Sequence, residues 1–312
     1  MISVIVPCYN EEDSINTFYT ELKKEIYNTE HEILMINDGS TDRTLSIIKD
    51  LAEKDSCIRY YSFSRNFGKE AAIYAGLCNA GGEYVVCMDA DMQDPPSLLP
   101  RMLRILEEDK SIDSVATRRV SREGEPKIRS FCARAFYKLI NKISDADVVD
   151  GARDYRLMRR EMVDAVISLT EYNRFSKGIF GWVGFNTYWL PYENIERVAG
   201  ETKWSFWKLS RYALDGIISF SEVPLKLASY CGIFFTLVAF LFLVFIVLRK
   251  LIFGDPVAGW ASQICVTIFI GGIQLLCIGI VGLYLAKTHV EVKKRPHYIV
   301  ADTNDKNSQK IR

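Results

Sequence analysis

Short runs of apolar, β-branched and aromatic residues alternate with segments of helical length over the first 120 residues of the chain. These runs predict strands at 2–6, 32–36, 58–63, 84–88 and 113–116. Strands separated by helices are typical of βαβ crossovers, in which parallel strands form a sheet and helices cover both of its faces. The pattern therefore predicts an α/β fold with a mostly parallel sheet.

Polar clusters follow four of the five predicted strands, at residues 7–11, 37–42, 64–69 and 89–94. One such cluster alone is explained equally well as a helix cap or a turn. However, the carboxyl ends of parallel strands meet at one edge of a sheet, and ligands bind at that edge. We therefore expect the four clusters to form a single site.

Two long apolar stretches occupy the last third of the chain. Residues 227–248 form a run of 22 residues without a formal charge, and residues 256–286 form a run of 31. Both exceed the roughly 20 residues that a helix needs to cross a bilayer. We predict two transmembrane helices, at about 227–248 and 260–286, joined by a short polar turn. The alternative is a helical hairpin buried inside a soluble protein.

Basic residues flank this hairpin on both sides, and positive charge favours the cytoplasmic side of a membrane. The flanking residues are Lys203, Lys208, Arg211 and Lys226 before it, and Lys287, Lys293, Lys294 and Arg295 after it. We expect a multi-pass protein of the cell membrane with its globular domain and both termini in the cytoplasm. The chain enters its first predicted strand at once, so no N-terminal signal peptide is expected.

The segment before the hairpin alternates aromatic and apolar residues with Lys and Arg, which is typical of an amphipathic helix lying in the headgroup plane. The chain is therefore divided into a cytoplasmic domain at 1–200, an amphipathic juxtamembrane segment at 201–226, the two spans within 227–286 and a basic cytoplasmic tail at 287–312.

Composition excludes several classes of function. The 39 Lys and Arg residues balance 39 Asp and Glu residues, so the chain lacks the basic field of a nucleic-acid binder and no nucleic-acid partner is expected. Eight Cys residues form no C-x-x-C pair and only three His are present, which argues against a disulfide framework or a zinc site. Neither a P-loop nor a G-x-G-x-x-G motif occurs, so the sequence does not support a P-loop NTPase or a Rossmann dinucleotide-binding site.

The strongest chemical signal is the pair Asp89 and Asp91, with Gln93 two positions further on. Their oxygen atoms are hard ligands suited to Mg²⁺ or Mn²⁺, which in turn would bridge a diphosphate. A D-x-D pair alone is a weak signal, and a solvated acidic turn is the alternative. Its place directly after an apolar strand and before Pro95 and Pro96 favours the metal site.

Five motifs together resemble the family 2 glycosyltransferases of GT-A fold, specifically the polyprenyl-phosphate glycosyltransferases, which include dolichyl-phosphate mannose synthase and bacterial bactoprenol glucosyltransferases. The resemblance covers nearly the whole chain, including the two-span hairpin. The motifs are Val6-Pro7-Cys8-Tyr9-Asn10-Glu11-Glu12, Asn37-Asp38-Gly39-Ser40-Thr41-Asp42, Arg65-Asn66-Phe67-Gly68-Lys69, Asp89-Ala90-Asp91-Met92-Gln93-Asp94-Pro95-Pro96 and Asp154-Tyr155-Arg156-Leu157-Met158.

The resemblance implies roles for individual residues. It implies a nucleotide-sugar site made by Pro7, Tyr9, Glu11, Ile36, Asp38 and Lys69. It places Asp89, Ala90 and Asp91 at the ribose, the diphosphate and the metal, with Gln93 as a further metal ligand. Arg118 and Lys203 fall where the family has basic residues on the donor phosphates or the lipid phosphate.

Three further residues have an open assignment. Arg129 and Arg134 lie on a helix-like stretch at 126–143 and are candidates for the acceptor phosphate, with a solvated basic face as the alternative. Asp154 falls where the family has a carboxylate, commonly called the base, near the acceptor. A phosphate monoester, with a second pKa of about 6, needs little deprotonation, so Asp154 either acts as a base, orients the sugar, or forms an ion pair with Arg153 or Arg156.

The implied activity is an inverting, Mg²⁺- or Mn²⁺-dependent transfer of a sugar from UDP-glucose or UDP-N-acetylglucosamine to undecaprenyl phosphate. The product would donate the sugar to cell-envelope glycans, and the resemblance implies a homo-oligomer, for instance a tetramer. The alternatives are a GDP-mannose-dependent mannosyltransferase and a non-catalytic, membrane-anchored nucleotide-sugar-binding protein. A processive polysaccharide synthase would need more spans and a Q-x-x-R-W motif, which the sequence lacks.

Overall fold

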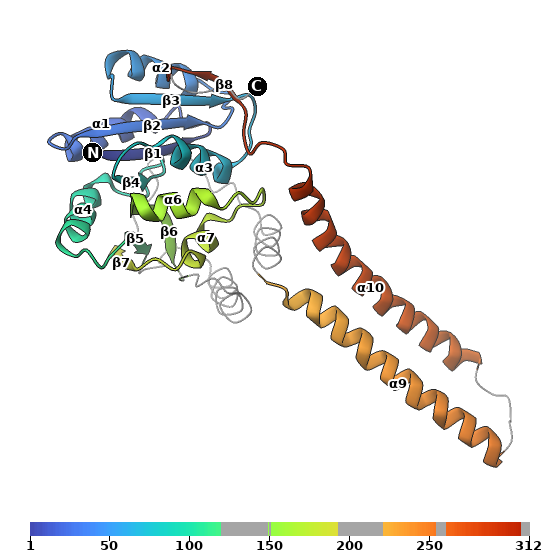
Figure 1. Cartoon of the computed structure of the whole chain (residues 1–312). Coiled ribbons are helices and arrows are strands. Elements are labelled where there is room, and N and C mark those ends of the chain that lie inside the picture. The colour runs from blue at the N-terminus through green and yellow to red at the C-terminus, as the bar shows by residue number, and fades with distance from the viewer. Residues whose placement is uncertain (120–148, 150, 193–220, 254–259, 307–312) are drawn as a thin grey trace.

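The computed structural model describes residues 1–119, 149, 151–192, 221–253 and 260–306. In this part of the chain one sheet of eight strands is present, in the order β7-β5-β6-β4-β1-β2-β3-β8 (Figure 1). The strands are β1 (Ile2–Cys8), β2 (His31–Asn37), β3 (Ile58–Phe63), β4 (Tyr84–Cys87), β5 (Ser114–Arg119), β6 (Ala152–Arg159), β7 (Thr187–Tyr192) and β8 (Val300–Thr303).

The direction of the strands confirms the expected mostly parallel sheet. Strand β1 pairs in parallel with β2 and β4, β2 with β3, and β5 with β7. Strand β6 is antiparallel to both β4 and β5, and β8 is antiparallel to β3. The five strands predicted from apolar runs are β1 to β5, whereas β6, β7 and β8 were not predicted.

Helices cover both faces of the sheet, as expected for this class. On one face lie α1 (Ile15–Ile26), α2 (Thr44–Lys54) and α4 (Leu99–Glu108), the last preceded by a 3₁₀ turn, η1 (Pro96–Leu98). On the other lie α3 (Lys69–Asn79), α6 (Arg160–Ser168) and α7 (Ser176–Trp182). The sheet is thus buried between two layers of helices.

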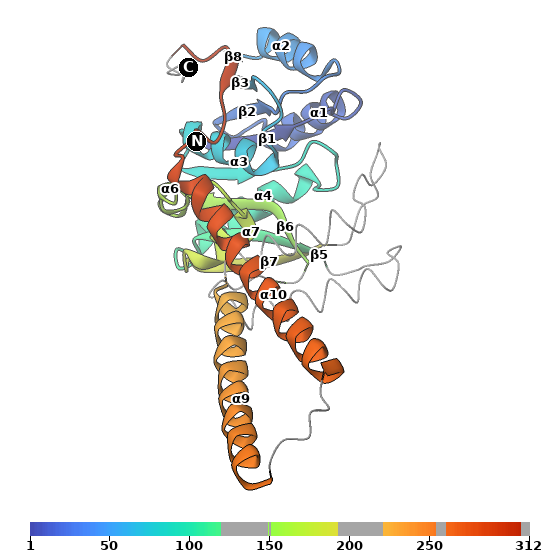
Figure 2. The same ribbon diagram turned by 90° about the vertical axis from the view of Figure 1, so that its right-hand side faces the viewer.

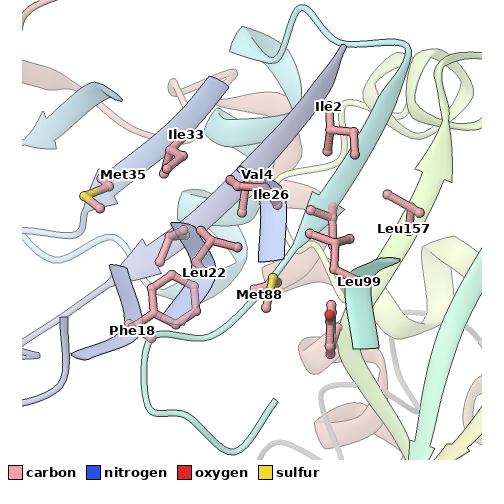
Figure 3. Packing of buried hydrophobic residues seen from close by; sticks show 14 of the residues in the cluster. Ile2, Val4, Phe18, Leu22, Ile26, Ile33, Met35, Met88, Leu99 and Leu157 are labelled. Atoms are coloured by element: carbon pink, nitrogen blue, oxygen red, sulfur yellow. The ribbon is translucent and has the colours of Figure 1, made fainter. Parts of the chain in front are cut away.

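The first layer is held by the apolar stripe of α1. Phe18, Leu22 and Ile26 recur every four residues, lie on one side of the helix and are almost fully buried. Figure 3 shows them beside Val4 of β1 and Met88. Burial of each large apolar side chain contributes about 1.5–3 kcal/mol to stability, so this stripe fixes α1 on the sheet.

The second layer packs more closely because α3 presents small residues to the sheet. Ala72 and Ala75 are fully buried, and a Cβ atom on Gly76 would lie 2.2 Å from Cγ2 of Ile5. Helix α3 can therefore approach β1 only with glycine at this position. This close approach places Lys69, the first residue of α3, at the carboxyl edge of the parallel strands.

Two long apolar helices, α9 (Val223–Phe253) and α10 (Trp260–Val292), extend away from the sheet domain (Figures 1 and 2). Candidate spans lie at Val223–Phe242 and Val266–Val292, with mean hydropathy 1.9 and 2.3. Large side chains such as Leu237 and Leu275 are exposed along them, at 56% and 71%. The alternative of a hairpin buried in the protein's own core does not hold, and two candidate membrane helices are confirmed.

Parts of the predicted domain division lie outside the described residues. These include residues 201–220 of the expected amphipathic segment and the turn at 254–259. The amphipathic helix therefore stays a prediction.

After α10 the chain returns to the sheet, which sequence analysis did not predict. The segment expected to be a basic tail supplies β8, whose residues pair with Tyr61, Ser62 and Phe63 of β3. At the end of α10, Glu291 accepts hydrogen bonds from the backbone N–H groups of Tyr172 and Asn173. If α9 and α10 each cross a membrane, the sheet domain and β8 must therefore lie on the same side of it.

A buried polar network secures β8. Asp305 accepts hydrogen bonds from the hydroxyl of Tyr61, at 2.5 Å, and from Nη2 of Arg59. The other guanidinium nitrogen of Arg59 donates to Glu32 on β2 at 2.7 Å. The side chains of Asp305 and Glu32 are only 10% and 12% exposed. Loss of Asp305 would remove the acceptor of the Tyr61 hydroxyl, and Tyr61 is fully buried.

We expect Asp305→Asn to lower the stability of the full-length protein by roughly 1–3 kcal/mol, because a charged acceptor for two donors is removed. This corresponds to a drop of several degrees in Tm, measurable by thermal unfolding in detergent. The matched control is Asp302→Asn, since Asp302 pairs with Lys49 at the surface, where both side chains are about 40% exposed and an ion pair contributes little. Equal Tm values for the two variants would contradict the role of Asp305.

Candidate active site

The loops that follow β1 and β2 are joined by hydrogen bonds. The backbone N–H of Asn10 donates to Oγ of Ser40 at 3.0 Å, and Oδ1 of Asn10 accepts from the N–H of Thr41 at 2.9 Å. The N–H of Glu11 donates to Oγ1 of Thr44 at 2.8 Å. Asn10 has φ 56°, a left-handed conformation that Asn adopts more readily than most residues. The first two polar clusters thus form one surface.

Asp38 joins the third cluster to the second. Its carboxylate accepts hydrogen bonds from the backbone N–H groups of Phe67 and Gly68, at 2.7 and 2.9 Å. Asp38 is only 3% exposed, and burial raises its pKa although the two N–H groups act in the opposite direction. The residue therefore fixes the loop that leads into α3.

Gly39 allows this contact between loops. Its φ is +65°, and a Cβ atom there would lie 2.4 Å from the carbonyl carbon of Arg65. Both the left-handed backbone and the close approach require glycine.

Lys69 lies at the centre of the site. Its Nζ donates to Oδ2 of Asp89 at 2.7 Å and to Oδ2 of Asp154 at 2.6 Å. Lys69 begins α3, Asp89 follows β4 and Asp154 belongs to β6, so one ammonium group connects three elements. The Lys69 side chain is 43% exposed, which leaves this cluster accessible.

The charges in the cluster shift one another's pKa values. Although desolvation opposes it, the two carboxylates hold the pKa of Lys69 well above its usual value. Burial would raise the pKa of Asp154, but Lys69 and Lys177 hold it below the usual range. The ion pair of Asp154 is thus with Lys69, and the alternative of a direct pair with Arg153 or Arg156 is wrong for the described contacts.

The predicted metal ligands share one tight loop. Oδ1 of Asp91 accepts from the N–H of Gln93 at 3.1 Å, and Met92 between them has φ 61°. Oε1 of Gln93 accepts from Nη2 of Arg153 at 2.9 Å. Within the described residues, no group of three or more His, Cys, Asp or Glu side chains is placed to hold a metal ion. Two carboxylates nevertheless fit Mg²⁺ or Mn²⁺ when substrate phosphates supply further ligands.

Asp94, which was not predicted as a site residue, holds the end of this loop through contacts with β6 and β7. Asp94 is fully buried, and its Oδ1 accepts hydrogen bonds from Nε of Arg153 and the hydroxyl of Tyr192, both at 3.2 Å. Burial raises the pKa of Asp94 to about 6. Its position at the end of the acidic motif was a signal, but its partners on β6 and β7 could not be read from the sequence.

The other predicted nucleotide-site residues differ in exposure. Tyr9 is 42% exposed, and Glu11 accepts a hydrogen bond from Oγ of Ser14 at 2.6 Å. Pro7 lies in β1 and is partly exposed, whereas Ile36 and Ala90 are buried. The side chain of Ile36 packs in the core beneath the site, where it supports the loop that carries Asp38.

Of the four predicted phosphate-binding residues, one lies within the part of the chain that the structure describes. Arg118 is exposed on β5 and lies opposite Ala152 in the register with β6, two residues from Asp154. Arg129, Arg134 and Lys203 lie outside the described residues. The structure thus brings Asp38, Lys69, Asp89 and Asp154 to one edge, with Arg118 on the next strand.

Comparison with known proteins identifies the class. Residues 3–167 match the model of glycosyl transferase family 2, and the chain belongs to this family. It is 44% identical to CsbB of Bacillus subtilis, over 97% of this chain and 92% of the relative. It is 42% identical to the SfII prophage-derived bactoprenol glucosyl transferase of Shigella flexneri, over 96% of this chain and 97% of the relative.

A solved structure shows a weaker likeness, on which the family assignment does not depend. The mannosyltransferase PcManGT from Pyrobaculum calidifontis, in complex with GDP-Man and Mn²⁺, is 21% identical, with a TM-score of 0.48 over 67% of this chain and 60% of that chain.

We expect Gly39→Ala to lower both Tm and activity. The left-handed backbone costs an alanine about 1–2 kcal/mol, and the clash with Arg65 must also be relieved by moving the loop that Asp38 holds. The matched control is Gly81→Ala, whose Cβ would meet its nearest atom at 3.5 Å, an ordinary contact. The two Tm values, measured by thermal unfolding, should differ by several degrees. Equal stability and activity of the Gly39→Ala and Gly81→Ala proteins would contradict the requirement for glycine at position 39.

Proposed function

We propose that this protein transfers a sugar from a nucleotide sugar to a polyprenyl phosphate at a membrane surface. The observation that carries the proposal is the accessible cluster of Lys69, Asp89 and Asp154 in a family 2 chain that also has two candidate membrane helices. The name of the Shigella flexneri relative supports undecaprenyl phosphate as the acceptor and UDP-glucose as the donor. UDP-N-acetylglucosamine and GDP-mannose are the competing donors.

The chemistry is a single displacement at the anomeric carbon. An oxygen of the lipid phosphate forms the new bond as the bond to the nucleotide diphosphate breaks, so the anomeric configuration inverts. A phosphate monoester has a second pKa of about 6 and is mostly dianionic at neutral pH. The attacking group therefore needs no base, and we propose that Asp154 orients the reacting groups together with Lys69.

Asp89 and Asp91, assisted by Gln93, would hold Mg²⁺ or Mn²⁺. When bound, such a cation supplies neutralisation of the charge that develops on the leaving diphosphate. Asp89 is already paired with a cation, the ammonium group of Lys69, which supports this edge as a place where positive charge and phosphate meet.

The remaining predicted residues complete the proposal. Pro7, Tyr9, Glu11 and Asp38, on the joined loops after β1 and β2, would receive the nucleotide. Basic residues would receive the phosphates of donor and lipid, namely Arg118, Arg129, Arg134 and Lys203. We further propose that the sheet domain and both termini are cytoplasmic, where nucleotide sugars are made, and that the protein is a homo-oligomer.

The function is tested with the full-length protein in detergent. Undecaprenyl phosphate and Mg²⁺ or Mn²⁺ are supplied, and labelled UDP-glucose, UDP-N-acetylglucosamine and GDP-mannose are offered separately. We expect label from UDP-glucose in the organic phase and its loss on addition of EDTA. Label from another donor would show that a different sugar is transferred. Absence of lipid-linked label with all three donors would contradict the proposed reaction.

Two substitutions separate the roles of the carboxylates. We expect Asp91→Ala to reduce turnover by at least about 10²-fold, because electrostatic stabilisation of the leaving group is lost. Asp154→Asn should reduce kcat while the KM for the donor changes little. Asp50→Asn, an exposed carboxylate on α2, is the control and should be unchanged. Near-normal turnover in Asp91→Ala would disprove the metal assignment.

A further inference from the structure

A cavity of about 410 Å³ is lined by residues of α7, of β7 and of the first part of β6. The described residues in its wall include Arg153, Arg156, Lys177, Phe180, Thr187 and Trp189. Nζ of Lys177 donates a hydrogen bond to the carbonyl oxygen of Ala152 at 3.0 Å, two residues before Asp154. The cavity therefore lies beside the cluster of Lys69, Asp89 and Asp154, but none of the residues assigned above to the nucleotide, the metal or the lipid phosphate lines it.

The wall of the cavity is positively charged. Three cationic residues are in the lining, Arg153, Arg156 and Lys177, and the described lining contains no Asp or Glu. Arg153 is compensated by its ion pair with the buried Asp94. Lys177 and Arg156 form no ion pair with a carboxylate within the described residues. Among the described residues, these two cations therefore have no carboxylate in direct contact, although Asp154 is near enough for Lys177 to lower its pKa.

Arg156 is the more unusual of the two. It is only 4% exposed, and Nη1 donates to two neutral hydroxyl groups, Oγ of Ser114 at 3.0 Å and Oγ1 of Thr187 at 3.1 Å. Nε is buried without a hydrogen-bond partner in the described structure. Desolvation lowers the pKa of Arg156 to about 10, so the guanidinium still carries its charge at neutral pH.

Aromatic rings compensate this charge only in part. The guanidinium carbon lies 4.8 Å from the ring centre of Phe180 and 5.3 Å from that of Trp189. A cation–π contact is weaker than the desolvation penalty of a buried charge that has no ionic partner. An anion in the cavity would remove this imbalance.

We infer that this cavity binds a phosphate group. A phosphate group could accept hydrogen bonds from both Arg156 and Lys177, neither of which has a carboxylate in direct contact among the described residues, and guanidinium and ammonium groups are strong donors to phosphate oxygens. A neutral sugar fits less well, because the described wall has no carboxylate to accept from hydroxyl groups. The phosphate belongs either to a lipid headgroup or to a soluble molecule.

The test uses the full-length protein in detergent, with no donor nucleotide present, so that its result does not depend on sugar transfer. Inorganic phosphate is titrated at constant ionic strength while Tm is followed, because a ligand that binds only the folded state stabilises it by RT ln(1 + [L]/Kd). For the wild type we expect Tm to begin to rise near the dissociation constant of phosphate and then to increase with the logarithm of its concentration. Lys177→Gln, which removes a side chain with a single described hydrogen bond, should weaken phosphate affinity at least ten-fold.

Arg156→Lys is the second variant, since it retains the charge but loses the planar donor set, and it should weaken phosphate affinity similarly. Arg101→Gln removes one positive charge from the exposed face of α4 and should bind phosphate as the wild type does. Where Arg156→Lys fails to fold, Lys177→Gln alone decides. Phosphate affinity within two-fold of the wild type in Lys177→Gln would overturn the inference, as would stabilisation by glucose but not by phosphate.

A second titration identifies the source of the phosphate. Citronellyl phosphate, a short polyprenyl phosphate, is compared with inorganic phosphate and with citronellol. Tighter binding of citronellyl phosphate that depends on Lys177 assigns the cavity to a lipid headgroup. Equal Lys177-dependent affinity for both phosphates assigns it to a soluble phosphate, and binding of citronellol as tight as that of citronellyl phosphate contradicts a phosphate site.

Discussion

The contact of Lys69 with Asp89 and Asp154 is the interaction on which the site depends. Two carboxylates, Asp89 after β4 and Asp154 on β6, would repel each other at this edge, and a single ammonium group makes their proximity favourable. Lys69 reaches both carboxylates because α3 lies close to β1. This close approach requires glycine at position 76, where a Cβ atom would clash with the Ile5 side chain. A packing constraint in the core thus determines the geometry of charges at the surface.

The same edge is built from loops that hold one another. Asn10, Asp38 and Gly39 carry the contacts between successive loops, and each uses a property specific to its residue type. Asn tolerates a left-handed backbone, a buried carboxylate accepts two N–H groups, and glycine permits a close approach. The polar residues that a sequence motif presents as ligand contacts are therefore also the residues that hold the loops in place.

Burial, charge and strand length explain which elements of the fold the sequence could predict. Strands β1 to β4 have mostly apolar centres because helices cover both faces, so their pattern is clear. Strand β6 carries Arg153, Asp154 and Arg156, and these charges hide its strand pattern. Strand β8 is four residues long and forms only against the edge of β3. The pairing of Lys69 with Asp154 joins residues far apart in the chain, which no local pattern encodes.

The return of the chain after α10 has a consequence for any reaction at a membrane surface. Glu291 holds the end of α10 to the segment between α6 and α7. Further along the chain, β8 pairs with β3 and forms the edge of the sheet opposite β7. The hydroxyl of Tyr284 donates to the carbonyl oxygen of Ser221 at 2.6 Å, which joins the starting segment of α9 to α10. The sheet domain is thus attached to the hairpin at separate points rather than through one linker. A soluble donor and a membrane-bound acceptor can react only if the site lies at a suitable distance from the membrane surface. Attachment at separate points restricts that distance.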